Sequence, residues 1–96
     1  MDSYEISSSS KQRSEFKKLC EQARSEDRLA DAARAAKEII ARLQADPTIV
    51  GELLFHLKHW KLPVRHVVEA PWSLHFAVDE KRRIVYLRRM SLLAVK

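Results

Sequence analysis

Residues 72–90 read WSLHFAVDEKRRIVYLRRM. From Trp72 to Val78 every second residue is large and apolar, which is typical of a strand with one buried face. Residues 79–82 are all charged and predict a turn of about four residues, a common length for a hairpin. Residues 83–90 are apolar on both parities, which favours a central strand. The stretch therefore predicts an antiparallel β-hairpin.

The segment before this hairpin continues the strand pattern. Residues 64–69 alternate between the two faces, and Ala70–Pro71 interrupts the pattern before the next strand. Residues 49–60 are apolar without a clear period, and Gly51, the one glycine of the chain, marks a turn among them. Two interpretations stay open for the apolar residues near Leu53, Phe55 and Trp60: they cover the core, or they meet a partner.

Two amphipathic helices are predicted in the first half. Apolar residues recur at helical spacing from about Lys11 to Ser25 and again from Arg28 to Ala45. Asp27 is the predicted N-cap of the second helix, and Asp46–Pro47 ends it. The join between them is short, so we expect a helical hairpin. Its predicted core positions are Leu29, Ala36, Ile40 and Leu43.

Together these patterns predict an α+β fold. A helical hairpin, with a short first strand at Tyr4–Ile6, should pack on a C-terminal antiparallel sheet of three to four strands. The 96 residues allow one domain, residues 1–96.

Composition excludes several classes of protein. The chain is 46% hydrophobic and 32% charged, which is the balance of a globular protein. No apolar run approaches the roughly 18–20 residues that span a bilayer, and the first residues do not resemble a signal peptide. The lone cysteine, Cys20, allows no internal disulfide. We expect a cytoplasmic protein without a membrane partner.

The net positive charge is confined to the second half of the chain. Residues 1–46 hold nine Lys or Arg and nine Asp or Glu, whereas residues 47–96 hold nine against four. All four histidines also lie there. Such a half attracts polyanions or acidic proteins. The alternative is a solvated face that keeps the protein soluble.

Metal and cofactor chemistry find little support in the sequence. His56 and His59 have the spacing of metal ligands, but only Glu52 lies near them as a further ligand. Cys20 falls on the apolar face of the first helix, where it is expected to be a small core residue. One glycine is too few for a nucleotide phosphate loop. The sequence therefore predicts no metal and no small-molecule cofactor.

Cations and histidines along the predicted sheet are the candidate functional residues. Arginine suits bidentate contact with phosphate, and histidine moves protons near neutral pH. Such a set could bind RNA, or cleave it by stabilising a pentacoordinate phosphate. The alternative for Arg88 or Arg89 is an ion pair with Glu69 or with an acid of a helix. The candidate catalytic residues are His66, His75 and Arg65, and the candidate target-binding residues are Lys58, Lys61, Arg65, Arg83, Arg88 and Arg89.

The order of elements and several short motifs resemble the RelE/ParE toxin superfamily. The resemblance extends from Tyr4 to Met90. It depends on Leu43-x-x-Asp46-Pro47, Gly51-Glu52, Arg65, Ala70-Pro71-Trp72, Phe76-x-Val78-Asp79 and Val85-Tyr86-Leu87-Arg88-Arg89-Met90.

This resemblance implies the toxin of a type II toxin–antitoxin pair. Its partner would be an antitoxin that wraps the helices and the basic sheet, and its target the ribosome with mRNA, or DNA gyrase. By the same resemblance, Arg65 stands at the position of a family sheet cation, and Trp72 at that of an arginine that opens the next strand. Residues 91–96 contain no counterpart of the family's C-terminal arginine and tyrosine.

Whether the protein is an enzyme stays open at this point. One hypothesis is a ribosome-dependent mRNA endoribonuclease. The other is a toxin that acts without catalysis, or a small basic module that binds RNA or protein.

Overall fold

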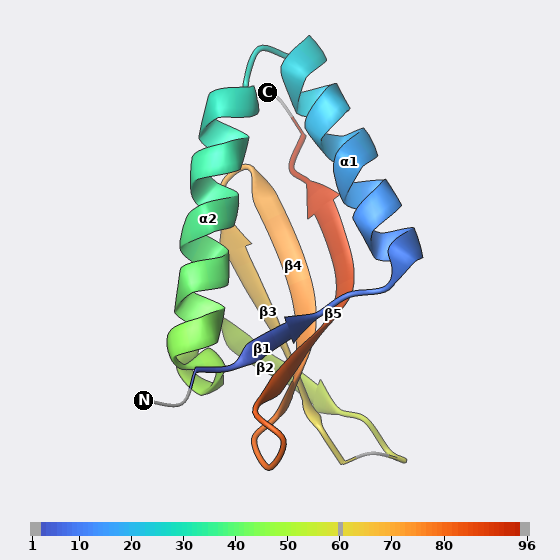
Figure 1. Cartoon of the computed structure of the whole chain (residues 1–96), viewed down its shortest axis with the longest axis vertical. Helices are drawn as coiled ribbons and strands as arrows, with labels where there is room; N and C mark the ends of the chain where they lie inside the picture. Colours follow the sequence, from blue (N-terminus) through green and yellow to red (C-terminus); the bar gives the residue numbers. More distant parts are fainter. Residues whose placement is uncertain (1–2, 60, 95–96) are drawn as a thin grey trace.

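The chain runs through a short strand, two helices and four further strands in the computed structural model, which describes residues 3–59 and 61–94 (Figure 1). β1 (Glu5–Ser7) is followed by α1 (Ser10–Ser25), α2 (Leu29–Ala45) and a 3₁₀ turn (Pro47–Ile49). The remaining elements are β2 (Glu52–His56), β3 (Pro63–Glu69), β4 (Trp72–Asp79) and β5 (Ile84–Leu92). The predicted α+β class is confirmed. Trp60 lies outside the described residues.

The sheet has five strands in the order β1-β5-β4-β3-β2. β2 to β5 form an antiparallel meander, whereas β1 pairs with β5 in parallel, so the sheet is mixed. The expectation of three to four antiparallel strands is therefore wrong, since Glu5–Ser7 and Glu52–His56 both join the sheet.

A β-bulge explains why the period of β2 is ambiguous in the sequence. The pairing of β2 with β3 shifts register between Leu53 and Phe55, so Leu54 is an extra residue. Leu53 pairs with Arg65 and Phe55 with Val64. Because the two partners are consecutive residues of β3, Leu53 and Phe55 lie on opposite faces of the sheet. The bulge thus removes the alternation that identifies a strand.

Both helices occur where the sequence predicts them. Ser9 caps α1 in a capping box: its hydroxyl accepts from the Gln12 backbone N–H at 3.1 Å, and the Gln12 side chain accepts from the Ser9 N–H at 2.8 Å. The predicted cap of α2 is wrong. Asp27 has a φ of 57°, and Arg28 occupies the cap position without a side-chain hydrogen bond.

The helices cover one face of the sheet and enclose the core. Trp72, Leu74, Phe76 and Val78 of β4 all point towards the helices, as their alternation predicts. From α2 they meet Ala32, Ala35, Ile39 and Leu43. Of the four predicted core positions of α2, only Leu43 is fully buried; the other three are half-buried. The buried stripe of α2 is thus centred one position away from the predicted one.

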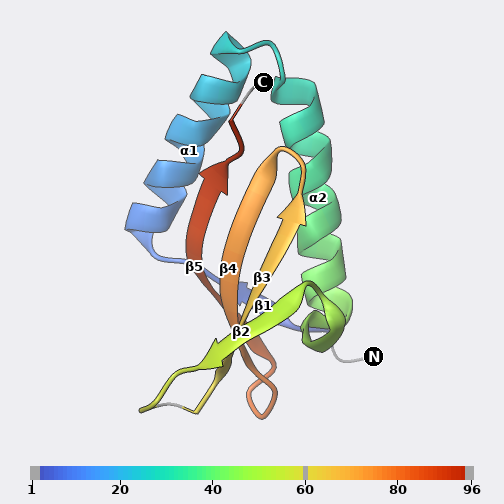
Figure 2. The same ribbon diagram turned by 180° about the vertical axis from the view of Figure 1, so that it is seen from behind.

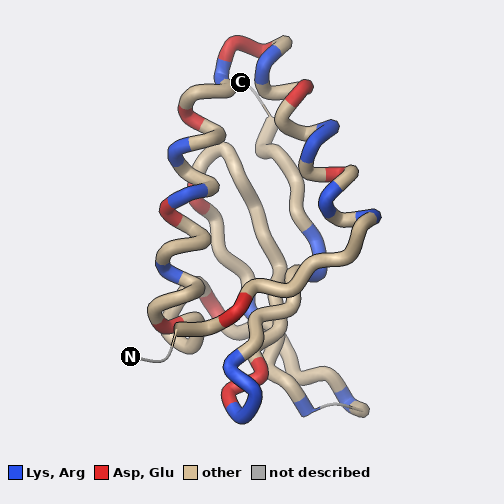
Figure 3. Tube along the Cα trace, viewed as in Figure 1, with Lys and Arg blue, Asp and Glu red and all other residues tan. Residues whose placement is uncertain are grey.

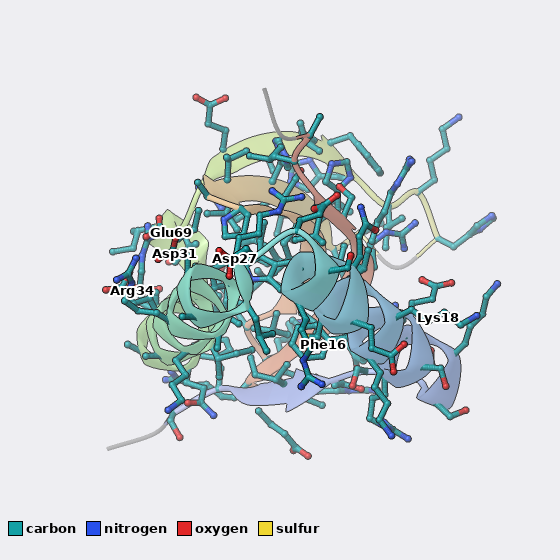
Figure 4. All side chains as sticks on the ribbon, turned by 90° about the horizontal axis from the view of Figure 1, so that it is seen from above. Phe16, Lys18, Asp27, Asp31, Arg34 and Glu69 are labelled. Atoms are coloured by element: carbon teal, nitrogen blue, oxygen red, sulfur yellow. The ribbon has the colours of Figure 1, made fainter. Side chains whose placement is uncertain are left out.

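Trp72 joins β4 to both helices. Its side chain is 1% exposed, and its Nε1–H donates to the carbonyl oxygen of Ala32 at 2.7 Å. Its ring stacks on Phe16, with centroids 5.3 Å apart. Figure 4 shows Phe16 between the two helices, while Lys18 and Arg34 point outwards on opposite sides of the molecule.

The β4–β5 hairpin differs in detail from its predicted bounds. β5 begins at Ile84 rather than at residue 83, because Arg83 has a φ of 58° and belongs to the turn. The strand continues to Leu92, two residues beyond the predicted end. β1 pairs with only its first part, Ile84 to Tyr86. From Leu87 onwards, α1 lies beside β5 instead (Figure 1).

None of the described helices covers the other side of the sheet. Figure 2 shows β3, β4 and β5 from this side, with β2 crossing in front of their lower ends. We call the surface of β3 and β4 that bears His66, Ser73 and His75 the open face. All three side chains are half-buried.

Candidate nucleic-acid interface

Two histidines lie side by side at the centre of the open face. His66 of β3 and His75 of β4 are direct cross-strand partners. Their ring centroids are 4.7 Å apart, and the rings meet edge to face at 72°. The equal distances of the two residues from the β3–β4 turn fix this pairing. The two rings can therefore contact one small group, such as a phosphate and its neighbouring hydroxyl.

The surroundings of His75 favour its neutral form. Burial lowers the pKa of His75 below 6.5, and the positive charges of His66, Arg89 and Arg88 lower the pKa further. A neutral imidazole at neutral pH can accept a proton. The environment of His75 thus keeps it in the form that can accept a proton.

Ser73 holds the other imidazole in place. The Oγ of Ser73 lies 2.7 Å from Nε2 of His66, within hydrogen-bond distance. Ser73 and His75 stand on the same face of β4, two residues apart. Ser73 is not among the predicted site residues, although its parity places it on the same face as His75.

Arg89 extends the histidine pair onto β5. It is the register partner of His75, so the row on this face runs His66, His75, Arg89 across three strands. The pairing shifts register between His75 and Phe76, which makes Arg88 the extra residue of a bulge. Both arginine side chains are exposed. They lie on the part of β5 that β1 does not cover, so their charge is available at the edge of the open face.

Arg65 lies apart from the histidines. It precedes His66 on β3, and successive residues of a strand face opposite ways. Its Nε–H donates to the carbonyl oxygen of Val50 and its Nη2–H to that of Gly51, both at 2.8 Å. These two hydrogen bonds tie the start of β2 to β3. The structure therefore places Arg65 in a supporting position and does not bring it together with His66 and His75.

The remaining predicted cations gather at one end of the molecule. Lys58 and Lys61 lie in the loop between β2 and β3, and Arg83 lies in the turn between β4 and β5. Figure 3 shows positive charge in both of these segments, accompanied by negative charge in the β4–β5 turn, and a mixture of both signs along the helices. Lys61 and Lys81 line a hollow of about 720 Å³ between the two loops. The Arg83 guanidinium lies 5.2 Å from the centroid of the Tyr4 ring, in a cation–π contact.

An apolar groove of about 400 Å³ opens between the two helices above the sheet. Phe16, Ile39, Ile40, Trp72, Leu74, Leu87 and Met90 line it. Arg13, Arg88 and Arg89 lie at the same groove with one acid, Glu15. The Gln12 amide donates to the carbonyl oxygens of Leu87 and Arg88, which holds α1 against β5. The two arginines of β5 thus connect the groove to the open face.

Two other residues that the sequence brought forward, Trp72 and Cys20, pack in or against the hydrophobic core. Trp72, matched by resemblance to a strand-opening arginine, is buried in the core rather than on the open face. Cys20 packs against the core, and burial raises the pKa of its thiol, with a smaller opposing effect of Arg24. Within residues 3–59 and 61–94, no group of three or more His, Cys, Asp or Glu side chains is placed to hold a metal ion.

Comparison with models of protein families, with curated proteins and with solved structures gave no significant match. Neither of the two described helices combines the length and the apolar character that a membrane-crossing helix needs.

Proposed function

We propose that this protein is the toxin of a type II toxin–antitoxin pair, of the RelE/ParE type, and that it acts on RNA through the open face. The observation that carries the proposal is the row of His66, His75 and Arg89 across three strands. This row combines two groups that exchange protons with one that binds phosphate. The excess of positive charge in residues 47–96 adds long-range attraction for a polyanion.

The row has the chemistry of a metal-independent RNA cleavage. The neutral imidazole of His75 takes the proton of a ribose 2′-hydroxyl, and the 2′-oxygen attacks the adjacent phosphorus. The bond from phosphorus to the 5′-oxygen breaks, and this oxygen takes a proton from the second imidazole. Arg89 stabilises the negative charge that builds up on the phosphate oxygens. Ser73 keeps the second imidazole in one orientation.

The groove between the helices supports the second half of the proposal, a cognate antitoxin. Its apolar lining and the arginines at its edge suit a segment that is apolar on one side and acidic at its flanks. Because Arg88 and Arg89 belong to both surfaces, a segment bound in the groove would neutralise charge that RNA requires.

A function without catalysis has one observation in its favour. Neither the apolar groove between the helices nor the hollow between the two loops is lined by His66 or His75. Arg65 is also held by two backbone carbonyls. The second candidate function is therefore a module that binds RNA or protein through the same face.

Induced expression in a bacterial host tests the toxin proposal. Protein and DNA synthesis are pulse-labelled over the first minutes after induction. The proposal predicts that protein synthesis falls first and that mapped mRNA 5′ ends reveal new cuts. DNA synthesis failing first would point to a gyrase-type target, and unchanged growth would remove the toxin proposal.

Variants of exposed or half-buried residues assign the effect to the open face. His66→Ala, His75→Ala and Arg89→Ala should each restore growth. His59→Ala, in the β2–β3 loop, and Arg34→Ala, which points away from the sheet (Figure 4), are the matched controls. Loss of cuts with retained RNA binding would indicate catalysis. Loss of binding alone would indicate the second candidate function.

A further inference from the structure

β2 exposes more apolar surface than the rest of the sheet. All five of its residues are exposed, and Leu53, Leu54 and Phe55 retain 50%, 45% and 48% of their accessible surface. Ile49, three residues before the strand, is 76% exposed. Together these neighbouring residues expose on the order of a few hundred Å² of apolar surface along one edge of the sheet.

β2 is also a free edge of the sheet. It pairs with β3 on one side, and no described strand pairs with its other side. Edge strands of monomers are commonly short or protected by lysine or proline. β1, the edge strand at the opposite end of the sheet, is short, with three residues. β2 is longer, with five residues, and its sequence, Glu-Leu-Leu-Phe-His, contains neither lysine nor proline.

The bulge at Leu54 does not remove the apolar character of this edge. It places Leu53 and Phe55 on opposite faces of the sheet, as their partners on β3 show. A strand added beside β2 would therefore meet an apolar side chain both above and below the sheet. An added strand that is itself apolar on both faces fits this edge best.

The charges of the segment make it complementary to itself. Glu52 begins β2, while His56 ends it and Lys58 follows in the loop. In a two-fold antiparallel arrangement of two β2 strands, the acidic end of one strand lies beside the basic end of the other. Isologous pairing of this kind closes after two copies.

We infer that the chain forms a homodimer through β2, with a second copy of the chain as the occupant of this edge. The two five-stranded sheets join along antiparallel β2 strands, and Leu53, Leu54 and Phe55 of both copies pack together. The open face of each copy stays accessible, because β2 contributes its outer edge to the contact. The dimer is thus a property separate from the action on RNA.

The size of the contact predicts a dimer that depends on concentration. A standard stable interface buries about 800 Å² per partner. A five-residue strand with three exposed apolar side chains contributes less, so we expect a micromolar Kd. Sedimentation equilibrium of the full chain from about 5 to about 200 µM covers this range.

The dimer should dissociate when β2 is made polar. Leu54→Lys should leave a monomer at every concentration, and its thermal transition should match that of the wild-type chain at concentrations too low for the dimer, since residue 54 is exposed. Leu93→Lys, also at an exposed leucine but beyond β5, is the matched control and should retain the dimer. A wild-type chain that is monomeric at the highest concentration overturns the inference, as does a dimer that Leu54→Lys leaves intact.

Exchanging the charges at the two ends of the segment tests the antiparallel arrangement. The test compares a single variant with a double variant, so a small loss of folding stability does not decide its outcome. Glu52→Lys should weaken the dimer by about tenfold, because like charges then meet at both ends. Adding Lys58→Glu should restore most of the loss. If the double variant dimerises no better than Glu52→Lys alone, the two strands do not run antiparallel and the inference fails.

Discussion

Replacement of Trp72 by phenylalanine measures how strongly β4 holds the helices. Trp72 is 1% exposed, and its indole N–H donates to the Ala32 carbonyl at 2.7 Å. Phenylalanine lacks this donor, at a cost of about 1 kcal/mol for a buried hydrogen bond. The smaller ring also leaves a space against Phe16, and this cavity lowers the stability by about a further 1–2 kcal/mol. We expect Trp72→Phe to lower the free energy of unfolding by about 2–3 kcal/mol.

This loss is large against the total stability of about 5–14 kcal/mol expected for the chain length. It corresponds to a fall in Tm of roughly 10–20 °C. Urea unfolding followed by far-ultraviolet circular dichroism measures the change, and an unaltered m value shows that the folded state remains compact. Phe16→Leu, at the half-buried partner of the stack, should cost less. A loss below about 0.5 kcal/mol for Trp72→Phe would refute the assigned contact of β4 with α2.

Three further changes test other parts of the account. Gly51→Ala should destabilise the fold by at least about 2 kcal/mol, measured by urea unfolding. The reason is that Gly51 has a φ of 67° and an added Cβ would lie 2.1 Å from the carbonyl oxygen of His66. An unaffected variant would contradict the register of β2 on β3. Ala32→Asp should prevent cooperative thermal unfolding, because residue 32 is fully buried. Ala33→Asp, at an exposed position, should change the stability by about 0.5 kcal/mol or less. The reverse order of effects would show that the register of α2 is wrong. The pKa of folded His75 lies below its unfolded value of 6.5, so the unfolded chain takes up the proton first as the pH falls, and the stability from this group should decline below about pH 6.5 and level off below the folded pKa. Urea unfolding of His75→Gln should lack this part of the pH dependence, and equal curves for the two proteins would contradict the environment assigned to His75.

The fold follows from the sequence wherever one face of an element is buried. The stripe of α2 and the alternation of Trp72 to Val78 both reflect a one-sided core, and both elements occur as predicted. β2 lacks such a signal, because its five residues are exposed and a bulge interrupts its alternation. β1 has too few residues for a period, and a parallel partner 79 positions away is not visible in the pattern.

The candidate site could be predicted only in part. The parity of His66 and His75 and the turn at Ala70–Pro71 are sufficient to place the histidines together. The position of Arg65 could not be predicted, because its hydrogen bonds go to carbonyl oxygens of the β2 entry, a segment without a clear sequence pattern. The contribution of Ser73 depends on a side-chain contact across two strands, which parity alone does not specify.

The most direct test of the account is a titration of the purified protein with a single-stranded RNA oligonucleotide, followed through the imidazole resonances of the histidines. The account predicts that His66 and His75 shift together, that His59 changes little, and that the affinity falls steeply with added salt. Arg89→Ala should reduce these shifts, and Arg34→Ala should not. Resonances of His66 and His75 that stay unchanged while RNA binds elsewhere, or that do not respond at all, would contradict the assignment of the open face as the RNA-binding surface.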